Sequence, residues 1–144
     1  MLTFPCLAFV FSGRSVVVAR DKTFFETSTS SRVRAGFWRV PFRIVDLDLR
    51  EFEARELLIL GGRGRWWGWR LSLNREIRIR LDFAPCGPTS LQQVKAMTAA
   101  AIINDPTGMW LGGDRSPEEL VEVVERSASI RGLIQELVWP PLSL

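Results

Sequence analysis

The sequence predicts an α+β fold, in which a curled antiparallel sheet or small half-barrel of five to seven strands (residues ~4–83) precedes two helices (~90–103 and ~117–137). Apolar and polar residues alternate with a period of two through much of the first 83 residues, which is typical of strands with one buried face. Beyond residue 88 the apolar period becomes helical. The 144 residues, 47% of them hydrophobic, suffice for one core, so we expect a single domain over residues 1–144.

The first strands are short and follow one another closely. LAFVF (7–11) and SVVVA (15–19) are apolar runs on either side of Gly13, and they predict a hairpin. KTFFETS (22–28) predicts the next strand. TSTSSR (27–32) has no apolar anchor and predicts a polar loop.

The segment FWRVPFRIVDLDL (37–49) predicts a strand whose alternation changes phase. One face holds Trp38, Val40, Phe42 and Ile44, and the other holds Val45, Leu47 and Leu49. A regular strand cannot bury both sets on one face, so we expect a bulge or sharp bend near Ile44–Val45. Pro41 has no N–H group to donate, which favours a position at a sheet edge or in that bulge.

Further strands are predicted up to residue 83. REFEAR (50–55) predicts a charged connection, and ELLIL (56–60) predicts a buried strand. LGGRGRWWGWRLSL (60–73) and NREIRIRLDF (74–83) predict a glycine turn followed by a hairpin.

The parity of this hairpin predicts which residues face each other. A three-residue turn would pair Leu73 with Ile77 and Leu71 with Ile79. The apolar face of the hairpin would then also hold Trp67 and Trp69, which we expect in the core.

The opposite face of the hairpin is a candidate binding surface. Its members are Trp66, Arg70, Arg78 and Arg80, and the glycine-rich turn adds Arg63 and Arg65. Arginines beside an aromatic ring bind phosphates and stack on bases or sugars. Residues 81–144 carry 8 Asp/Glu against 4 Lys/Arg, so the alternative is that a helix with its glutamates covers this face.

Two helices are predicted after residue 88. TSLQQVKAMTAAAIIN (89–104) has apolar residues at helical spacing and can be capped by Thr89 or Ser90. SPEELVEVVERSASIRGLIQELV (116–138) begins with a capping box of Ser116 and Glu119. The loop between the helices holds Met109 and Trp110, which are either interface anchors or packed against the helix pair.

The residue types that are absent restrict the chemistry. The chain has no histidine and no tyrosine, which removes the usual general base and the commonest metal ligand, so we expect neither an enzyme nor a metal or cofactor. Cys6 and Cys86 lie too far apart for a CxxC motif and are expected to be buried thiols, with a disulfide between them as the alternative if the protein is exported. Asp46 and Asp48 alternate and could act as an acid/base pair or hold a cation, but such residues usually form a solvated strand face.

The apolar start of the chain is interrupted by Pro5 and has no basic residue before it. We therefore interpret it as a buried strand and not as a secretory signal or membrane span, and we expect a cytoplasmic protein. The stretches RVPFRIVDLDL (39–49) and WGWRLSLNREIRIRLDF (67–83) are similar to bacterial versions of the pleckstrin-homology-type barrel. The order of several strands and then a helix also resembles that barrel, although the second helix is additional.

Three classes of function remain open at this point. The first is a non-catalytic module that binds a protein partner, such as a small adaptor or an immunity-type inhibitor. The second is a domain that binds nucleic acid or an anionic phospholipid surface through the arginine face. The third is an enzyme that uses Asp46 and Asp48.

Overall fold

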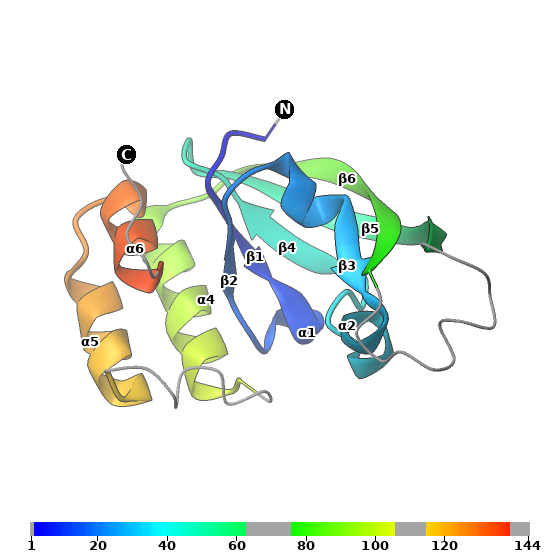
Figure 1. Cartoon of the computed structure of the whole chain (residues 1–144). Coiled ribbons are helices and arrows are strands. Elements are labelled where there is room, and N and C mark those ends of the chain that lie inside the picture. The colour runs from blue at the N-terminus through cyan, green and yellow to red at the C-terminus, as the bar shows by residue number, and fades with distance from the viewer. Residues whose placement is uncertain (1, 63–75, 106–114, 139–144) are drawn as a thin grey trace.

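The computed structural model describes residues 2–62, 76–105 and 115–138 of the chain (Figure 1). Within these ranges the strands are β1 (Cys6–Phe9), β2 (Val17–Ala19), β3 (Thr27–Thr29), β4 (Phe42–Val45), β5 (Arg50–Gly62) and β6 (Glu76–Pro88). The helices are α1 (Val10–Gly13), the 3₁₀ turn η1 (Lys22–Phe25), α2 (Ser30–Ala35), α4 (Leu91–Ile103), α5 (Pro117–Arg126) and α6 (Ile130–Leu137).

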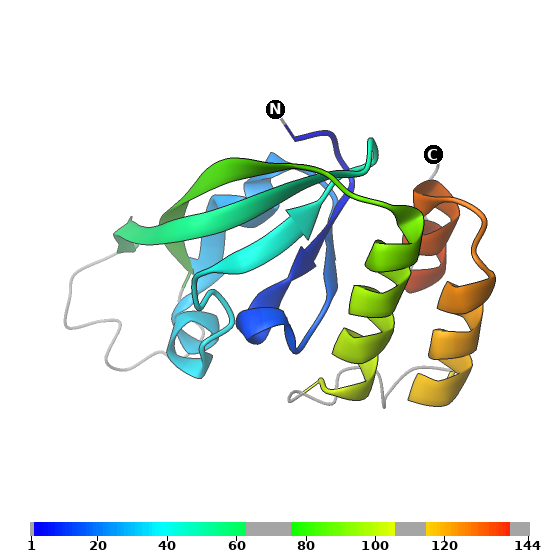
Figure 2. The same cartoon turned by 180° about the vertical axis from the view of Figure 1, so that it is seen from behind.

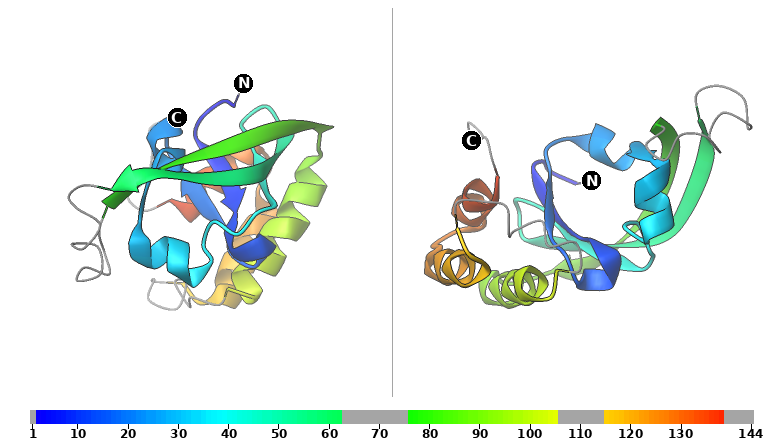
Figure 3. Two further views of the ribbon diagram at one scale, coloured as in Figure 1. Left: turned by 90° about the vertical axis from the view of Figure 1, so that its right-hand side faces the viewer. Right: turned by 60° about the horizontal axis from the view of Figure 1, so that its bottom comes forward.

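The strands form one antiparallel sheet in the order β2-β1-β4-β5-β6-β3. The sheet curls into a half-barrel, and its two end strands, β2 and β3, are not paired with each other (Figure 3). The helices α4, α5 and α6 follow the sheet in the chain. The predicted α+β class, with a curled antiparallel sheet before C-terminal helices, is therefore confirmed.

Two hydrophobic clusters lie on opposite faces of the sheet. The cluster inside the curl includes Cys6 and Ala8 of β1, and Trp38. The cluster outside the curl joins Leu7 and Phe9 of β1 to α4, α5 and α6. Figure 2 shows these helices beside β1 and β2, at the end of the sheet away from the far tips of β5 and β6. β1 is thus buried on both faces, which explains its continuous run of apolar residues.

The predicted first hairpin is confirmed. β1 and β2 pair with Leu7 opposite Val18. The turn between them includes Phe11 and Ser12, whose φ angles of 52° and 58° are unusual for residues other than glycine.

The prediction for residues 22–32 is largely wrong. Residues 22–25 form η1, which begins where the Asp21 side chain accepts a hydrogen bond from the Thr23 N–H at 2.9 Å. The polar residues expected in a loop form β3 and then α2, whose first turn is capped by the Thr29 hydroxyl. A hydroxyl side chain can accept a hydrogen bond from a free N–H group in the first turn of a helix, so a run of serine and threonine residues can begin a helix.

The predicted bulge near Ile44–Val45 is wrong. β4 pairs with β5 without a register shift, and it lies in the middle of the sheet between β1 and β5. Ile44 packs inside the curl and Val45 packs under the helices, so both faces of a regular strand are buried. Pro41 is neither in an edge strand nor in a bulge, because it precedes β4.

Residues 50–62 form one long strand, and the predicted charged connection at 50–55 is therefore wrong. Three register shifts interrupt the pairing of β5 with β6, and they let the hairpin bend with the curl. Within the run predicted as a buried strand, Ile59 and Leu60 are exposed by 58% and 51%.

Leu73 and Leu71, the predicted partners of Ile77 and Ile79, lie outside the described residues. Ile77 lies between Gly62 of β5 and Ser28 of β3, so both of its sides are occupied. Ile79 pairs with β5, and its N–H donates to the Glu26 carbonyl at 2.9 Å. β6 thus also pairs with β3, a long-range contact that no local pattern in the sequence indicates.

The second predicted helix is two helices. α5 begins with the predicted cap, because the Ser116 hydroxyl accepts from the Glu119 N–H at 3.2 Å. The helix ends at Arg126, before Ser127, and α6 starts after Ser129, whose hydroxyl accepts from the Gly132 N–H at 3.0 Å. The break lies at the serines because their hydroxyls compete for backbone hydrogen bonds. No helix in the described ranges has the length and hydropathy needed to cross a membrane.

Candidate functional site

The structure describes only part of the predicted arginine face. Arg78 and Arg80 lie on β6 with exposed side chains, two residues apart. No residue of β6 belongs to the cluster under the helices, so the alternative that an acidic helix covers these two arginines is wrong. The other predicted members of this surface, the two expected core tryptophans and the two candidate interface anchors lie outside the described residues: Arg63, Arg65, Trp66, Trp67, Trp69, Arg70, Met109 and Trp110.

The exposed face of β6 is not uniformly basic. Glu76 and Asp82 flank Arg78 and Arg80 on the same face of the strand, so the four side chains have no net charge. Across the strand pair, Leu58 lies opposite Arg80. This mixture weakens the field that an anionic polymer would meet.

Asp46 is a structural residue. Its side chain is completely buried, which overturns the expectation of a solvated strand face. One carboxylate oxygen accepts the N–H groups of Asp48 and Arg50, both at 3.0 Å. The other accepts the Thr3 N–H at 3.3 Å and Nε of Arg50 at 3.1 Å. These bonds fasten the turn after β4 to the N-terminal segment and leave no oxygen open to a reactant.

These contacts stabilise the charged form of the Asp46 carboxyl group. Burial raises the pKa of the carboxyl, but hydrogen bonds from the backbone of Arg50, Thr3 and Asp48 and from the Arg50 side chain outweigh burial and lower the pKa. Asp48 is exposed and shares the same guanidinium, with its Oδ2 at 3.5 Å from Arg50 Nη2. The two carboxylates therefore stabilise the turn after β4 through Arg50.

The two thiols differ in exposure. Cys6 is completely buried, as expected, and burial together with the nearby Asp46 charge raises its pKa. Cys86 is exposed, which corrects the expectation of a buried thiol, and the two are not bonded to each other. Cys86 stands in a bulge of β6 between Pro85, which pairs with Phe52, and Gly87, which pairs with Glu51.

We predict that a thiol reagent such as dithionitrobenzoate modifies one cysteine in the native protein. Cys86 is expected to react within minutes, whereas Cys6 reacts only after denaturant is added, because the thiolate is the reactive form and burial disfavours it. The Cys86→Ser variant is the control and should release no chromophore before unfolding. Rapid modification of native Cys86→Ser would contradict the burial of Cys6.

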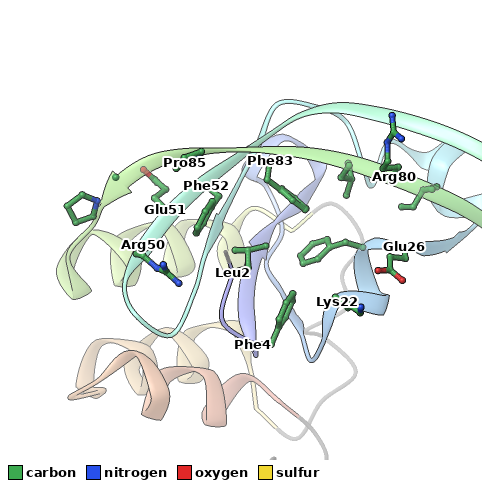
Figure 4. A pocket seen from close by; sticks show the side chains of 15 residues that line it. Leu2, Phe4, Lys22, Glu26, Arg50, Glu51, Phe52, Arg80, Phe83 and Pro85 are labelled. Atoms are coloured by element: carbon green, nitrogen blue, oxygen red, sulfur yellow. The ribbon is translucent and has the colours of Figure 1, made fainter.

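An apolar groove lies at the open side of the half-barrel. One wall is β6 with the start of β5, and the other wall is the N-terminal segment with η1 (Figure 4). Its volume is about 850 Å³, within the range of ~300–1,000 Å³ that is usual for binding pockets. The groove exists because β3 and β2 do not meet, so the curled sheet stays open along β6.

Apolar side chains point into this groove from both walls. Figure 4 shows Phe52 and Phe83 directed toward Leu2 and Phe4. Phe25 contacts residues of both walls, with its ring centroid 5.2 Å from that of Phe83 and 6.2 Å from that of Phe4. Aromatic rings supply large contact area, which is typical of ligand and interface sites.

Charged side chains lie at the two ends of the groove. Lys22, Glu26 and Arg80 lie toward one end, and Arg50 and Glu51 lie at the other (Figure 4). Glu51 forms an ion pair with Arg43 at 3.0 Å, and Arg50 is held by Asp46 at 2.9 Å. The body of the groove is therefore apolar, and the charges are confined to its ends.

Sequence reasoning missed this groove. Its walls come from residues 2–4, 22–26, 50–52 and 79–88, which no local pattern joins. The available signal was the apolar start of the chain, because Leu2 and Phe4 precede β1 and have no partner within their own hairpin.

Among the described residues, no group of three or more Cys, Asp and Glu side chains is placed to hold a metal ion.

Comparison with known proteins gives no further information about this site. A scan against models of protein families, a search of curated proteins and a search of solved structures each found no match for this chain.

Proposed function

We propose that this chain is a small non-catalytic binding module and that it binds a protein partner through the apolar groove. The observation that carries the proposal is the groove itself, a cavity of about 850 Å³ that is lined by aromatic and aliphatic side chains on both walls. Concave apolar sites of this size with a few polar groups are the usual form of binding sites.

The chemistry of the groove favours binding over catalysis. Catalysis needs a titratable group placed at the reacting atoms, and the lining of the groove has charges only at its ends. At one end, Arg50 and Glu51 are already engaged in ion pairs. The two unpaired thiols are typical of a reducing compartment, so we include a cytoplasmic location in the proposal.

We predict that Phe83→Glu abolishes capture of the partner. The tagged protein is incubated with a lysate of the source organism, with and without nuclease, and the captured proteins are identified by mass spectrometry. A carboxylate in the apolar groove would lose hydration on binding, so we expect at least a tenfold loss of one or more specific proteins. The matched control is Ile103→Glu, at a position on α4 that is 66% exposed and does not line the groove.

Circular dichroism of both variants checks that they are folded. Proteins that wild type and Ile103→Glu capture but folded Phe83→Glu does not are partners of the groove. Identical captured sets for all three proteins would contradict the proposal, as would the absence of any specific protein.

A second candidate is the binding of nucleic acid or an anionic phospholipid through β6. The observation that favours it is that Arg78 and Arg80 are adjacent, exposed and free of covering helices. Loss of specific capture on nuclease treatment in the experiment above would favour this candidate.

For this candidate we predict that the double variant Arg78→Glu/Arg80→Glu lowers the salt dependence of binding to a fluorescein-labelled DNA duplex. The slope of log affinity against log salt should fall by about 2, since each phosphate contact contributes about 0.9. Vesicles that contain phosphatidylserine test the lipid alternative in the same way. An unchanged slope with both probes would reject the arginine face as an anion site.

A further inference from the structure

The edge of β6 that borders the groove is open over much of its length. In the described part of the chain, β3 pairs only with residues 76–78 of β6. The next backbone contact on that side is the hydrogen bond from the Ile79 N–H to the Glu26 carbonyl. Beyond Ile79, none of the described strands follows this edge. An open edge presents N–H and C=O groups that another chain can pair with.

The direction of the backbone groups follows from strand alternation. In an antiparallel strand the N–H and C=O of one residue point to the same side, and those of the next residue point to the other side. The Ile79 N–H points away from β5, because it donates to Glu26. The N–H and C=O groups of Leu81 and Phe83 therefore point away from β5 as well. Both residues line the groove, so these groups lie at its border.

An extended peptide fits this arrangement better than an acyl chain does. A peptide that adds a strand to a sheet edge obtains main-chain hydrogen bonds from the edge and places alternate side chains in pockets. Here the edge stands beside an apolar groove that includes Phe25, Phe52 and Phe83. An acyl chain would cover the groups of Leu81 and Phe83 without bonding them, and burial of unbonded polar groups is unfavourable.

Charge indicates one further property of the occupant. At the η1 end of the groove Lys22 is exposed, and it forms no ion pair with any described residue. At the other end, Arg50 and Glu51 are paired within the protein. Two other charged residues line this end, Arg80 and Glu26, and neither forms an ion pair with a described residue. The two cations and one carboxylate leave this end with a net positive charge, which an acidic residue of the peptide would neutralise.

We infer that the groove binds an extended segment of the partner protein, which adds as a strand to the edge of β6 at Leu81 and Phe83. The segment carries alternate apolar side chains and an acidic residue at the Lys22 end. This inference rests on the proposed function, because it states which part of a partner the groove takes.

The first test measures amide hydrogen exchange of the free protein by nuclear magnetic resonance. The amides of Leu81 and Phe83 should exchange at least tenfold faster than that of Asp82, which points toward β5. Slow exchange at both Leu81 and Phe83 would overturn the inference, because the edge would already be paired.

The second test uses a displayed library of random twelve-residue peptides as the probe. Selected peptides should bind wild type, and bound peptide should slow exchange of the Leu81 and Phe83 amides at least tenfold. Phe83→Ala and Phe83→Pro both remove the ring, but only Phe83→Pro removes the N–H. We expect Phe83→Pro to bind at least fivefold more weakly than Phe83→Ala.

A third arm does not depend on the folding of a variant. Alternate backbone nitrogens of the selected peptide are methylated in two complementary patterns, and one pattern should abolish binding while the other leaves it. Equal binding of both methylated peptides, or no enrichment from the library, would overturn strand addition. The proposed function fails on a separate result, which is retention of partner capture by Phe83→Glu.

Discussion

Trp38→Ala is expected to lower the free energy of unfolding by about 3–5 kcal/mol, the usual cost of deleting a buried tryptophan side chain. The Trp38 ring is 1% exposed and lies inside the curl of the sheet. It contacts four aromatic rings at centroid distances of 4.7–6.2 Å, those of Phe24, Phe25, Phe37 and Phe42. Its indole N–H also donates to the Ser28 hydroxyl at 2.7 Å.

The structural consequence of Trp38→Ala extends beyond the cavity it leaves. Ser28 belongs to β3, so the indole ties the short end strand to the centre of the fold. Urea unfolding followed by circular dichroism measures the effect, with Trp38→Phe as the conservative variant and Ile103→Ala as an exposed control. We expect Trp38→Phe to lose less than half as much stability. A loss below about 1 kcal/mol for Trp38→Ala would contradict the described core.

Asp46→Ala is expected to lower the free energy of unfolding by about 3 kcal/mol, because it leaves buried N–H groups and a guanidinium without their acceptor. Three backbone N–H groups depend on this carboxylate, those of Thr3, Asp48 and Arg50. Loss of the Thr3 bond should also loosen the groove wall that carries Leu2 and Phe4. The control is Asp48→Ala, whose side chain is 61% exposed, and it should cost less than about 1 kcal/mol.

The contribution of Asp46 to the free energy of unfolding should decrease as the pH falls. The pKa of Asp46 is lower in the folded protein than in the unfolded chain. Its stabilisation is therefore complete above the unfolded carboxyl pKa of about 4 and is lost as the pH falls through the folded pKa. The stability difference between wild type and Asp46→Asn should shrink on acidification from pH 6 to pH 2, as measured by urea unfolding. A difference that grows toward low pH would contradict the assignment.

The class of the fold was predictable because the apolar period differs clearly between its two parts. Period-two alternation gave the strands, and the Ser116 capping box gave the start of α5. These signals depend on residues close together in the chain, so they can be recognised in a single sequence. The first hairpin, around Gly13, was predictable for the same reason.

The errors come from contacts between distant segments. The alternation predicts a bulge near Val45 because the sequence does not reveal that helices cover the second face of β4. The polar run predicts a loop at residues 27–29 because their strand partner, β6, lies almost 50 residues later. The charges of residues 50–55 predict a connection, but in the structure Glu51 and Glu53 form ion pairs with Arg43 on the neighbouring strand.

The candidate site was less predictable than the fold. A groove depends on where the sheet fails to close, and that follows from the three-residue length of β3 and its register on β6. Of the predicted arginine face, Arg78 and Arg80 share one face of β6 as expected, and the structure decides that this face is exposed at both residues. Glu76 and Asp82 flank these arginines on the same face, but the predicted arginine face does not include them.

The central claim is that the open side of the half-barrel is where this module meets its partner. The most direct test is a nitrogen–proton correlation spectrum of the labelled protein, recorded during titration with a captured partner. We expect the largest amide shifts on the walls of the groove, at residues 2–4, 22–26 and 79–83. Shifts confined to α4, α5 and α6, with the groove unchanged, would contradict it.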